Sequence, residues 1–158
     1  MKYFLGIEVA RGPQGLFLCH RKYALKIINE GGLLSAKPTE FPIEENHKLT
    51  LANGRLLKDA TQYHRLVGKL TYLTITHPDL VYVIHILSQF MQAPREEHMD
   101  VACRVLRYLK GTAGFGLLLP ANNDMTIYSF YDSDCGTCLL SGKSLTGYFI
   151  RLGALPIS

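Results

Sequence analysis

The chain has 158 residues, of which 47% are hydrophobic and 19% are charged, and its formal net charge is +4 at pH 7. A chain of this length and apolar content can bury a core, which excludes a disordered tail and indicates one or two small domains. The small positive charge permits a nucleic-acid partner without requiring one. No apolar run approaches the roughly 18 residues that span a bilayer, and the N-terminus has no signal-peptide or transit-peptide pattern. We therefore expect an intracellular protein with no membrane partner, in a compartment that the sequence does not indicate.

The first segment, residues 1–32, is predicted to contain a β-hairpin and a short helix. Apolar residues alternate from Tyr3 to Val9, and a second apolar run, Leu16–Cys19, follows a turn rich in glycine and proline. This pattern is typical of a hairpin. The spacing of the apolar residues between Tyr23 and Ile28 predicts a helix, which the following two glycines end.

Residues 33–60 show no periodicity, and their prolines and asparagines are scattered among charged residues. Such a composition predicts a long connection rather than a buried element. We expect either a boundary here between two semi-independent units or a segment that another part of a larger protein once covered.

Residues 61–111 are predicted to form three consecutive helices. Apolar side chains recur at helical spacing from Tyr63 to Leu73 and again from Leu80 to Met91. Between these stripes Pro78 ends the first helix. The Thr76 hydroxyl is placed to cap the second helix, because it can accept the free N–H of the first turn.

The third predicted helix runs from Glu96 to Gly111, with acidic residues at its start and Lys110 at its end, as the helix dipole prefers. Arg104, Arg107 and Lys110 lie at i, i+3 and i+6, opposite the apolar face. Such a row of cations can track phosphates, which makes these three residues the candidate nucleic-acid-binding site. The same pattern also fits an ordinary solvated helix face, and the sequence leaves both interpretations open.

The last segment, residues 112–158, is predicted to contain three antiparallel strands, over 115–119, 125–131 and 146–152. The turn residues between the first two strands predict that they form a hairpin with each other. The fold class is therefore α+β, with an N-terminal hairpin, a central three-helix segment and a partial antiparallel sheet. An incomplete sheet leaves an open edge, so self-association through this edge is expected.

Asp132 and Asp134 are the candidate metal-binding residues. At i and i+2 on a strand they point to one face, which suits a divalent cation if further carboxylates join them. Two acids at a strand end can equally be solvated. Because no Asp or Glu follows Asp134, the shell that two metal ions require is not completed from the rest of the strand region.

The cysteines and histidines give little indication of a second metal site. Cys135 and Cys138 form one C-x-x-C pair, but the six histidines are scattered, so a zinc site is disfavoured and all four cysteines, including Cys19 and Cys103, are expected as free thiols. His77 is expected at a helix entry, and His85 in the interior or at an interface.

Several long strings resemble the Pol polyproteins of Ty1/copia-type retrotransposons: KYFLGIEVA, GLFLCHRKYAL, RLVGKLTYL, THPDL, LSQFMQAP, RVLRYLKGT, YDSD and SLTGYFIRLG. They run from one end of the chain to the other. The resemblance implies the end of a reverse transcriptase, with primer-grip hairpin, thumb and connection, followed by the start of a ribonuclease H domain. It implies that Asp132 corresponds to a metal ligand and Asp134 to a second acid, with Mg²⁺ as the metal of the parent enzyme.

This chain departs from the family pattern at places that matter for activity. The family's polymerase aspartates would precede Met1 and its later ribonuclease H acids would follow Ser158. Cys135 replaces a tryptophan, and Leu139 and Leu140 replace a polar pair. We therefore expect a catalytically incomplete remnant without a cofactor, which at most binds a DNA or RNA–DNA duplex backbone non-specifically. The alternative is a domesticated adaptor module that binds nucleic acid or protein.

Overall fold

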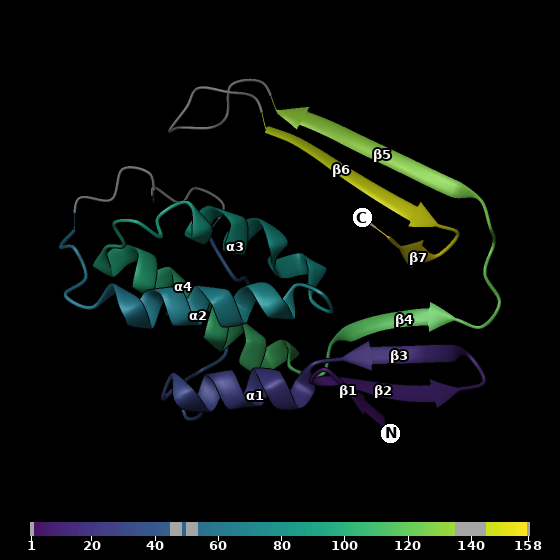
Figure 1. Cartoon of the computed structure of the whole chain (residues 1–158), viewed down its shortest axis with the longest axis horizontal. Coiled ribbons are helices and arrows are strands. Elements are labelled where there is room, and N and C mark those ends of the chain that lie inside the picture. The colour runs from purple at the N-terminus through teal and green to yellow at the C-terminus, as the bar shows by residue number, and fades with distance from the viewer. Residues whose placement is uncertain (1, 45–48, 50–53, 135–144, 158) are drawn as a thin grey trace.

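The computed structural model describes residues 2–44, 49, 54–134 and 145–157, with the backbone alone for residues 133, 134, 145 and 146. The chain folds into an N-terminal antiparallel sheet, a group of helices and a C-terminal antiparallel sheet (Figure 1). The predicted α+β class is confirmed. None of the helices within the described ranges combines the length and the apolar character that a membrane-spanning helix requires.

The first sheet has the order β1–β2–β3–β4 and all of its pairs are antiparallel. Its first three strands are β1 (Lys2–Phe4), β2 (Ile7–Gly12) and β3 (Gly15–Cys19). The sequence predicted one strand where the structure has β1 and β2, because a tight turn at Leu5 and Gly6 interrupts the alternation. Both turn residues have positive φ, 49° and 81°, and Tyr72 donates its hydroxyl hydrogen to the Leu5 carbonyl, which holds the turn.

The fourth strand, β4 (Gly116–Pro120), corrects a second prediction. It pairs with β3, in a register that places Gly116 opposite Cys19, and not with the strand that follows it. The predicted hairpin between these two neighbouring strands is therefore wrong. A glycine is needed at the start of β4, because a Cβ on Gly116 would lie 2.1 Å from the Leu18 carbonyl oxygen.

The helices are α1 (Arg21–Glu30), α2 (Ala60–Leu73), α3 (Val81–Ser88) and α4 (Glu96–Thr112), with a 3₁₀ turn, η2 (Pro78–Leu80), before α3. The apolar stripes predicted for the three central helices face one another and α1, which confirms the helical prediction. Asp59 caps α2 by accepting a hydrogen bond from the Thr61 N–H at 2.9 Å.

One predicted role near η2 is wrong. The Thr76 hydroxyl caps no helix, because its oxygen lies 2.7 Å from Nδ1 of His20, and η2 begins after His77 without a side-chain cap. His77 does lie at the entry of the turn, as expected, and is fully buried. His85 is exposed on α3, which excludes the interior position, while the interfacial one stays a prediction.

One hydrophobic core lies between the four helices. Its most deeply buried members come from every helix, and the Tyr63 hydroxyl inside it donates to the Leu87 carbonyl at 2.7 Å. Burial raises the pKa of Tyr63. The core comprises Ala24, Ile27, Ile28, Tyr63, Val67, Leu70, Leu73, Leu80, Val83, Ile84, Leu87, Ala102, Val105, Leu106, Leu109 and Ala113.

The segment between α1 and α2 is irregular wherever it is described, apart from an isolated bridge between Leu56 and Arg95. It is nevertheless attached to the helices, because Leu33, Ile43 and Leu57 pack against the core. The predicted long connection is thus partly a cover for the helices. The domain boundaries that the sequence suggested stay a prediction.

The C-terminal sheet consists of β5 (Ile127–Asp134), β6 (Leu145–Leu152) and the short β7 (Leu155–Pro156), in the order β5–β6–β7. In Figure 1 it lies apart from the helices, with β5 as its outer strand and β7 nearest to β4. Its assignment to a ribonuclease H fold stays a proposal.

Candidate functional site

The predicted cation row lies on α4. Two of its three members hold the segment between α1 and α2, which we call the connecting segment. Arg104 donates from Nη1 to Oε1 of Glu44 at 2.6 Å and from Nε to the Phe41 carbonyl at 3.3 Å. Lys110 donates from Nζ to the carbonyls of Leu34 and Ala36, the latter at 2.8 Å. These contacts fix the segment that runs across α4.

Arg107 differs from its two neighbours. Its side chain is half-buried, and it takes part in no ion pair within the described part of the chain. The charge of Arg107 also acts on the thiol of Cys103. Burial is the main cause that raises the pKa of Cys103, Asp100 raises it further, and Arg107 lowers it in part. The row is therefore not three free cations: Arg107 has the least competition for a phosphate, while Arg104 and Lys110 already have internal partners.

A second group of cations joins α1 to α2, and the sequence did not indicate it as a unit. Lys69 forms an ion pair with Glu30, and the charges of Lys26 and Arg65 also act on this carboxylate. The hydrogen bond from Lys69 is the main cause that holds the pKa of Glu30 below its usual value. Three cations around one acid leave a net positive surface, which we call the α1–α2 cation group.

Sequence patterns do not reveal this group because its members lie on two helices, and Lys69 and Glu30 are 39 residues apart. The available signal was the row of Arg21, Lys22 and Lys26 on the outer face of α1. Only the packing of α1 beside α2 brings Arg65 and Lys69 to it.

The candidate metal-binding acids lie on β5. Asp132 is exposed and faces Gly147 of β6, while Asp134 belongs to the same strand with its side chain outside the described set. Within the described ranges, no three histidine, cysteine or acidic side chains gather closely enough to hold a metal ion. One exposed carboxylate beside a glycine does not fit the carboxylate shell of a two-metal centre. Cys135, Cys138, Leu139 and Leu140 lie outside the described residues, whereas Cys19 and Cys103 are free thiols.

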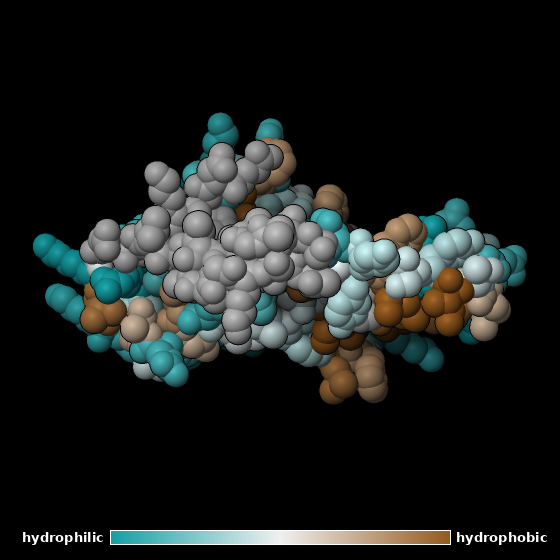
Figure 2. Space-filling model, turned by 90° about the horizontal axis from the view of Figure 1, so that it is seen from above, coloured by the Kyte–Doolittle hydropathy of each residue, from teal (hydrophilic) through white to brown (hydrophobic). Residues whose placement is uncertain are grey.

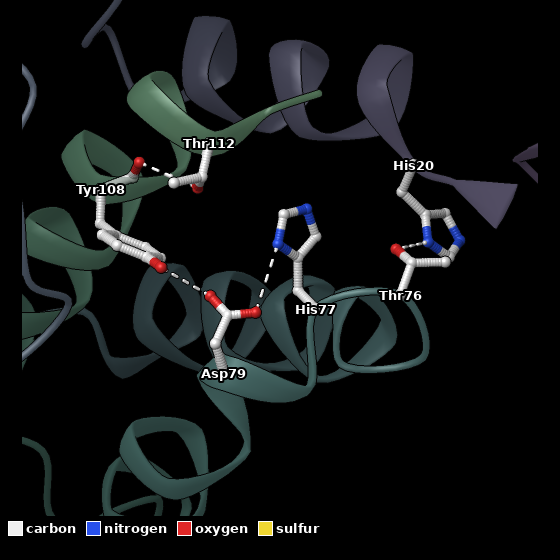
Figure 3. Close-up of polar contacts among 6 residues, drawn as sticks. All are labelled: His20, Thr76, His77, Asp79, Tyr108 and Thr112. Atoms are coloured by element: carbon white, nitrogen blue, oxygen red, sulfur yellow. Dashed lines mark hydrogen bonds and ion pairs between the residues drawn. The ribbon is translucent and has the colours of Figure 1, made fainter. Parts of the chain in front are cut away.

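A cluster of polar side chains lies where α1, η2 and α4 meet, with its histidines and threonine buried and Asp79 exposed at its edge, and we call it the histidine cluster (Figure 3). It contains His20, Thr76, His77, Asp79 and Tyr108. Nδ1 of His77 is 3.6 Å from Oδ1 of Asp79, which is too long for a hydrogen bond, whereas the Tyr108 hydroxyl donates to Oδ2 of Asp79 at 2.8 Å. Nε2 of His20 and both ring nitrogens of His77 are buried without a hydrogen bond from the described residues.

The electrostatics of the histidine cluster favour the neutral form of His20. Burial lowers the pKa of His20, and the neighbouring His77 lowers it further. Burial alone would raise the pKa of Asp79, but its contacts with His77 and Tyr108 outweigh burial and hold it below the usual value. Burial and Asp79 together raise the pKa of Tyr108 to about 12. The contacts of the cluster therefore join three elements of the fold.

Comparison with known proteins defines the class. The chain is 42% identical over its full length to a retrovirus-related Pol polyprotein from transposon RE2 of Arabidopsis thaliana, of which it covers 11%. It is 39% identical over 99% of its length to the uncharacterized mitochondrial protein AtMg00810 of the same plant, of which it covers 65%. It is also 44% identical over 77 residues to the uncharacterized mitochondrial protein AtMg00240, of which it covers 69%.

The chain is homologous over its whole length to the Pol polyproteins of Ty1/copia-type retrotransposons. The resemblance noted in the sequence is confirmed at this level. The chain spans about a tenth of the length of the Pol polyproteins it matches, 11% of each of the first two. No protein-family model and no solved structure matches it.

Proposed function

We propose that this chain corresponds to the part of a Pol polyprotein that joins reverse transcriptase to ribonuclease H, and that by itself it binds nucleic acid without catalysing a reaction. The full-length homology to Pol polyproteins carries the proposal. The order of elements supports it: a small sheet fits the primer grip, the four helices fit the thumb and connection, and β5–β7 fit the first strands of ribonuclease H.

The binding chemistry is an attraction between cations and phosphates, without readout of bases. Arg107 on α4 and the α1–α2 cation group are the side chains best placed for it, with Arg104 and Lys110 contributing where a phosphate displaces the connecting segment. Phosphate contacts of this kind carry no sequence information. The proposed partner is the backbone of a DNA or RNA–DNA duplex, and an intracellular location stays a prediction.

The lack of catalysis is part of the same proposal. Two divalent cations bring four positive charges, and Asp132 with Asp134 offset only two of them. Glu97 on α4 is engaged elsewhere, because its Oε1 accepts a hydrogen bond from the Gly54 N–H at 2.6 Å. Mg²⁺ is the metal of the parent family, and the described residues of this chain do not gather a set of ligands that fits it.

Binding is tested by fluorescence anisotropy on a labelled RNA–DNA hybrid over a series of salt concentrations. Each phosphate contact contributes a slope of about −0.9 in log K against log salt. We expect Arg107→Ala to flatten the slope by about one contact. The combined Lys26→Ala/Arg65→Ala/Lys69→Ala variant should flatten it further, whereas Lys58→Ala, an exposed control on the connecting segment, should leave it unchanged. Absence of binding at low salt, or equal slopes in all variants, contradicts the proposal.

Catalysis is tested on the same hybrid with Mg²⁺ or Mn²⁺. We expect no cleavage and no primer extension from the wild type, and no difference in Asp132→Asn. Metal-dependent cleavage that this substitution abolishes would overturn the non-catalytic proposal.

A second candidate function is a stand-alone adaptor that binds nucleic acid or protein. It is favoured by the existence of short relatives, since this chain covers 65% of AtMg00810 and 69% of AtMg00240. Sequencing the DNA that flanks the gene separates the two candidates. Polymerase and ribonuclease H aspartate motifs in neighbouring frames support the remnant, and their absence supports the adaptor.

A further inference from the structure

The outer strand of the C-terminal sheet, β5, has one edge with no strand paired to it among the described residues. The side chains of β5 and β6 are unusually apolar for an exposed ribbon: Tyr131 is 85% exposed, Ile127 68% and Tyr148 66%. Figure 2 shows apolar side chains at the surface of the end of the molecule that carries this sheet. A long unpaired edge next to exposed apolar side chains is a template for another strand.

The register of β5 and β6 assigns their side chains to two faces, because directly opposite residues of antiparallel strands point to the same side. One face carries the pairs Tyr128–Arg151, Phe130–Phe149 and Asp132–Gly147. We call this face the charged face, because its described side chains include one cation, Arg151, and one acid, Asp132, on an otherwise aromatic surface.

The cation and the acid of the charged face do not meet within one chain. Arg151 lies opposite Tyr128, four residues along the strand from Asp132, which is about 13 Å at roughly 3.3 Å per residue. The Arg151 guanidinium lies over the rings of Tyr128 and Phe130, with its carbon 4.7 and 5.5 Å from their centroids. Its Nε is buried without a hydrogen-bond acceptor among the described residues. Within the described part of the chain, the face thus holds a positioned cation that has no carboxylate partner.

We propose that β5 pairs antiparallel with β5 of a second copy of this chain, centred on Phe130. A two-fold axis perpendicular to a continuous sheet requires one residue to face its own copy, and centring on Phe130 also places Tyr128 opposite Asp132 of the second copy. Arg151, Tyr128 and the second copy's Asp132 then lie in one row across three strands. An arginine that already lies over the intervening ring reaches across this spacing, and symmetry forms the contact twice.

Other registers do not place Asp132 of the second copy in the row of Arg151. Centring on Asp132 opposes two carboxylates, which is destabilising. Centring on Tyr131 leaves Asp132 opposite Phe130, whose β6 neighbour is Phe149 rather than Arg151. The Phe130 register also brings the two Phe130 rings together beside the Phe149 rings, which lie 6.2 Å away within each chain.

The charge of the strand also favours this occupant over nucleic acid. The described acid of β5, Asp132, is exposed on the edge strand and would repel phosphates. A second copy instead supplies the positive charge of its own Arg151 to that acid. Pairing satisfies the free N–H and C=O groups of both edges as well.

Sedimentation velocity on the full chain over a range of concentrations tests the proposal. We expect the wild type to shift from the mass of one chain to twice that mass as concentration rises. Asp132→Arg should raise the dimer dissociation constant about tenfold or more, because the two arginines of a row then repel. Arg151→Asp should do the same, and the double variant Asp132→Arg/Arg151→Asp should recover most of the lost affinity.

Recovery in the double variant is the decisive readout, because the two residues are too far apart to rescue each other within one chain. Glu40→Arg, an exposed residue on the connecting segment, controls for the same change in net charge and should leave the dimer unchanged. Far-UV circular dichroism checks that each variant folds. A monomer at every soluble concentration, a dimer that the single charge reversals do not weaken, or no recovery in the double variant overturns the proposal.

Discussion

The four helices and the C-terminal sheet use their apolar side chains in opposite ways. On α4, Ala102, Val105, Leu106 and Leu109 are fully buried against the other helices. On β5, Ile127, Phe130 and Tyr131 are largely exposed although the strand is as rich in apolar residues. The helices complete a core among themselves, whereas the faces of β5 and β6 leave large apolar side chains at the surface. The comparison teaches that stability in this chain is concentrated in the helices and that the C-terminal sheet is available for association.

The largest expected contrast is in native-state hydrogen exchange. Amides of α2 and α4 should open only with global unfolding, which costs about 5–15 kcal/mol in an ordinary domain. Amides of β5 should exchange orders of magnitude faster at concentrations where the chain is monomeric. The central strand β3, paired on both sides, serves as an internal control. Equal protection of β5 and α4 in the monomer would break the comparison.

A core substitution should separate the two regions in a chemical denaturation experiment. Leu106→Ala removes a fully buried side chain from α4 and should lower the free energy of unfolding by about 2–5 kcal/mol. Phe149→Ala, on the exposed sheet, should cost less than about 1 kcal/mol because it leaves no enclosed cavity. Urea midpoints followed by circular dichroism at helical wavelengths measure both. A larger effect at Phe149 than at Leu106 would reverse the assignment of stability.

The helices should also respond to pH through the histidine cluster. The pKa of His20 is lower in the folded chain than its usual value of 6.5, so the unfolded chain binds more protons at acid pH. Stability is therefore full above pH 6.5 and decreases as pH falls below it, by at most about 1.4 kcal/mol per pH unit for one group.

His20→Gln should reduce this pH dependence, because glutamine keeps a side-chain partner for Thr76 without binding a proton. Part of the slope should persist, since burial also lowers the pKa of His98. His85→Gln, on the exposed side of α3, provides the comparison variant and should behave as the wild type. If the pH dependence of stability is unchanged in His20→Gln, the histidine cluster does not cause it.

The smallest effect concerns the contact between α4 and the connecting segment. Glu44→Gln removes the ion pair with Arg104, in which the Glu44 side chain is 71% exposed and that of Arg104 27%, and should cost only about 0.2–1 kcal/mol at low salt. Added salt should abolish the difference. The same variant frees Arg104 and should modestly tighten binding to the RNA–DNA hybrid.

Glu40→Gln is the matched control for both measurements. A loss of binding in Glu44→Gln would argue against competition between the connecting segment and a phosphate for Arg104.

The local patterns predicted most of the helical region and much less of its surroundings. The stripe from Tyr63 to Leu73 is buried as expected, since helical periodicity depends on neighbours three and four residues away. The pairing of β4 was predicted wrongly, because turn residues suggested a local hairpin while α4 returns the chain beside β3. Thr76 was misassigned for the same reason: its partner His20 is 56 residues away.

The candidate site divides in the same manner. The spacing of Arg104, Arg107 and Lys110 predicted a row on one helix face, and the row exists on α4. Two of these cations have partners in the connecting segment: Arg104 binds Glu44, and Lys110 binds the carbonyls of Leu34 and Ala36. The sequence did not predict these contacts, because the connecting segment has no periodicity of its own. The α1–α2 cation group needed the packing of two helices to exist at all.

The sequence by itself determined the α+β class, the three central helices, the acids Asp132 and Asp134 on a strand, and the kinship with Pol polyproteins. These depend on short-range periodicity or on identity with relatives, which need no tertiary contact. The tertiary structure alone decided that β4 joins the first sheet, that α4 holds the connecting segment, that His20 and His77 are buried together, and that β5 has an edge with no strand paired to it among the described residues. Each of these follows from contacts between residues distant in sequence, where several pairings satisfy the same local pattern and only the packing of the whole chain selects one.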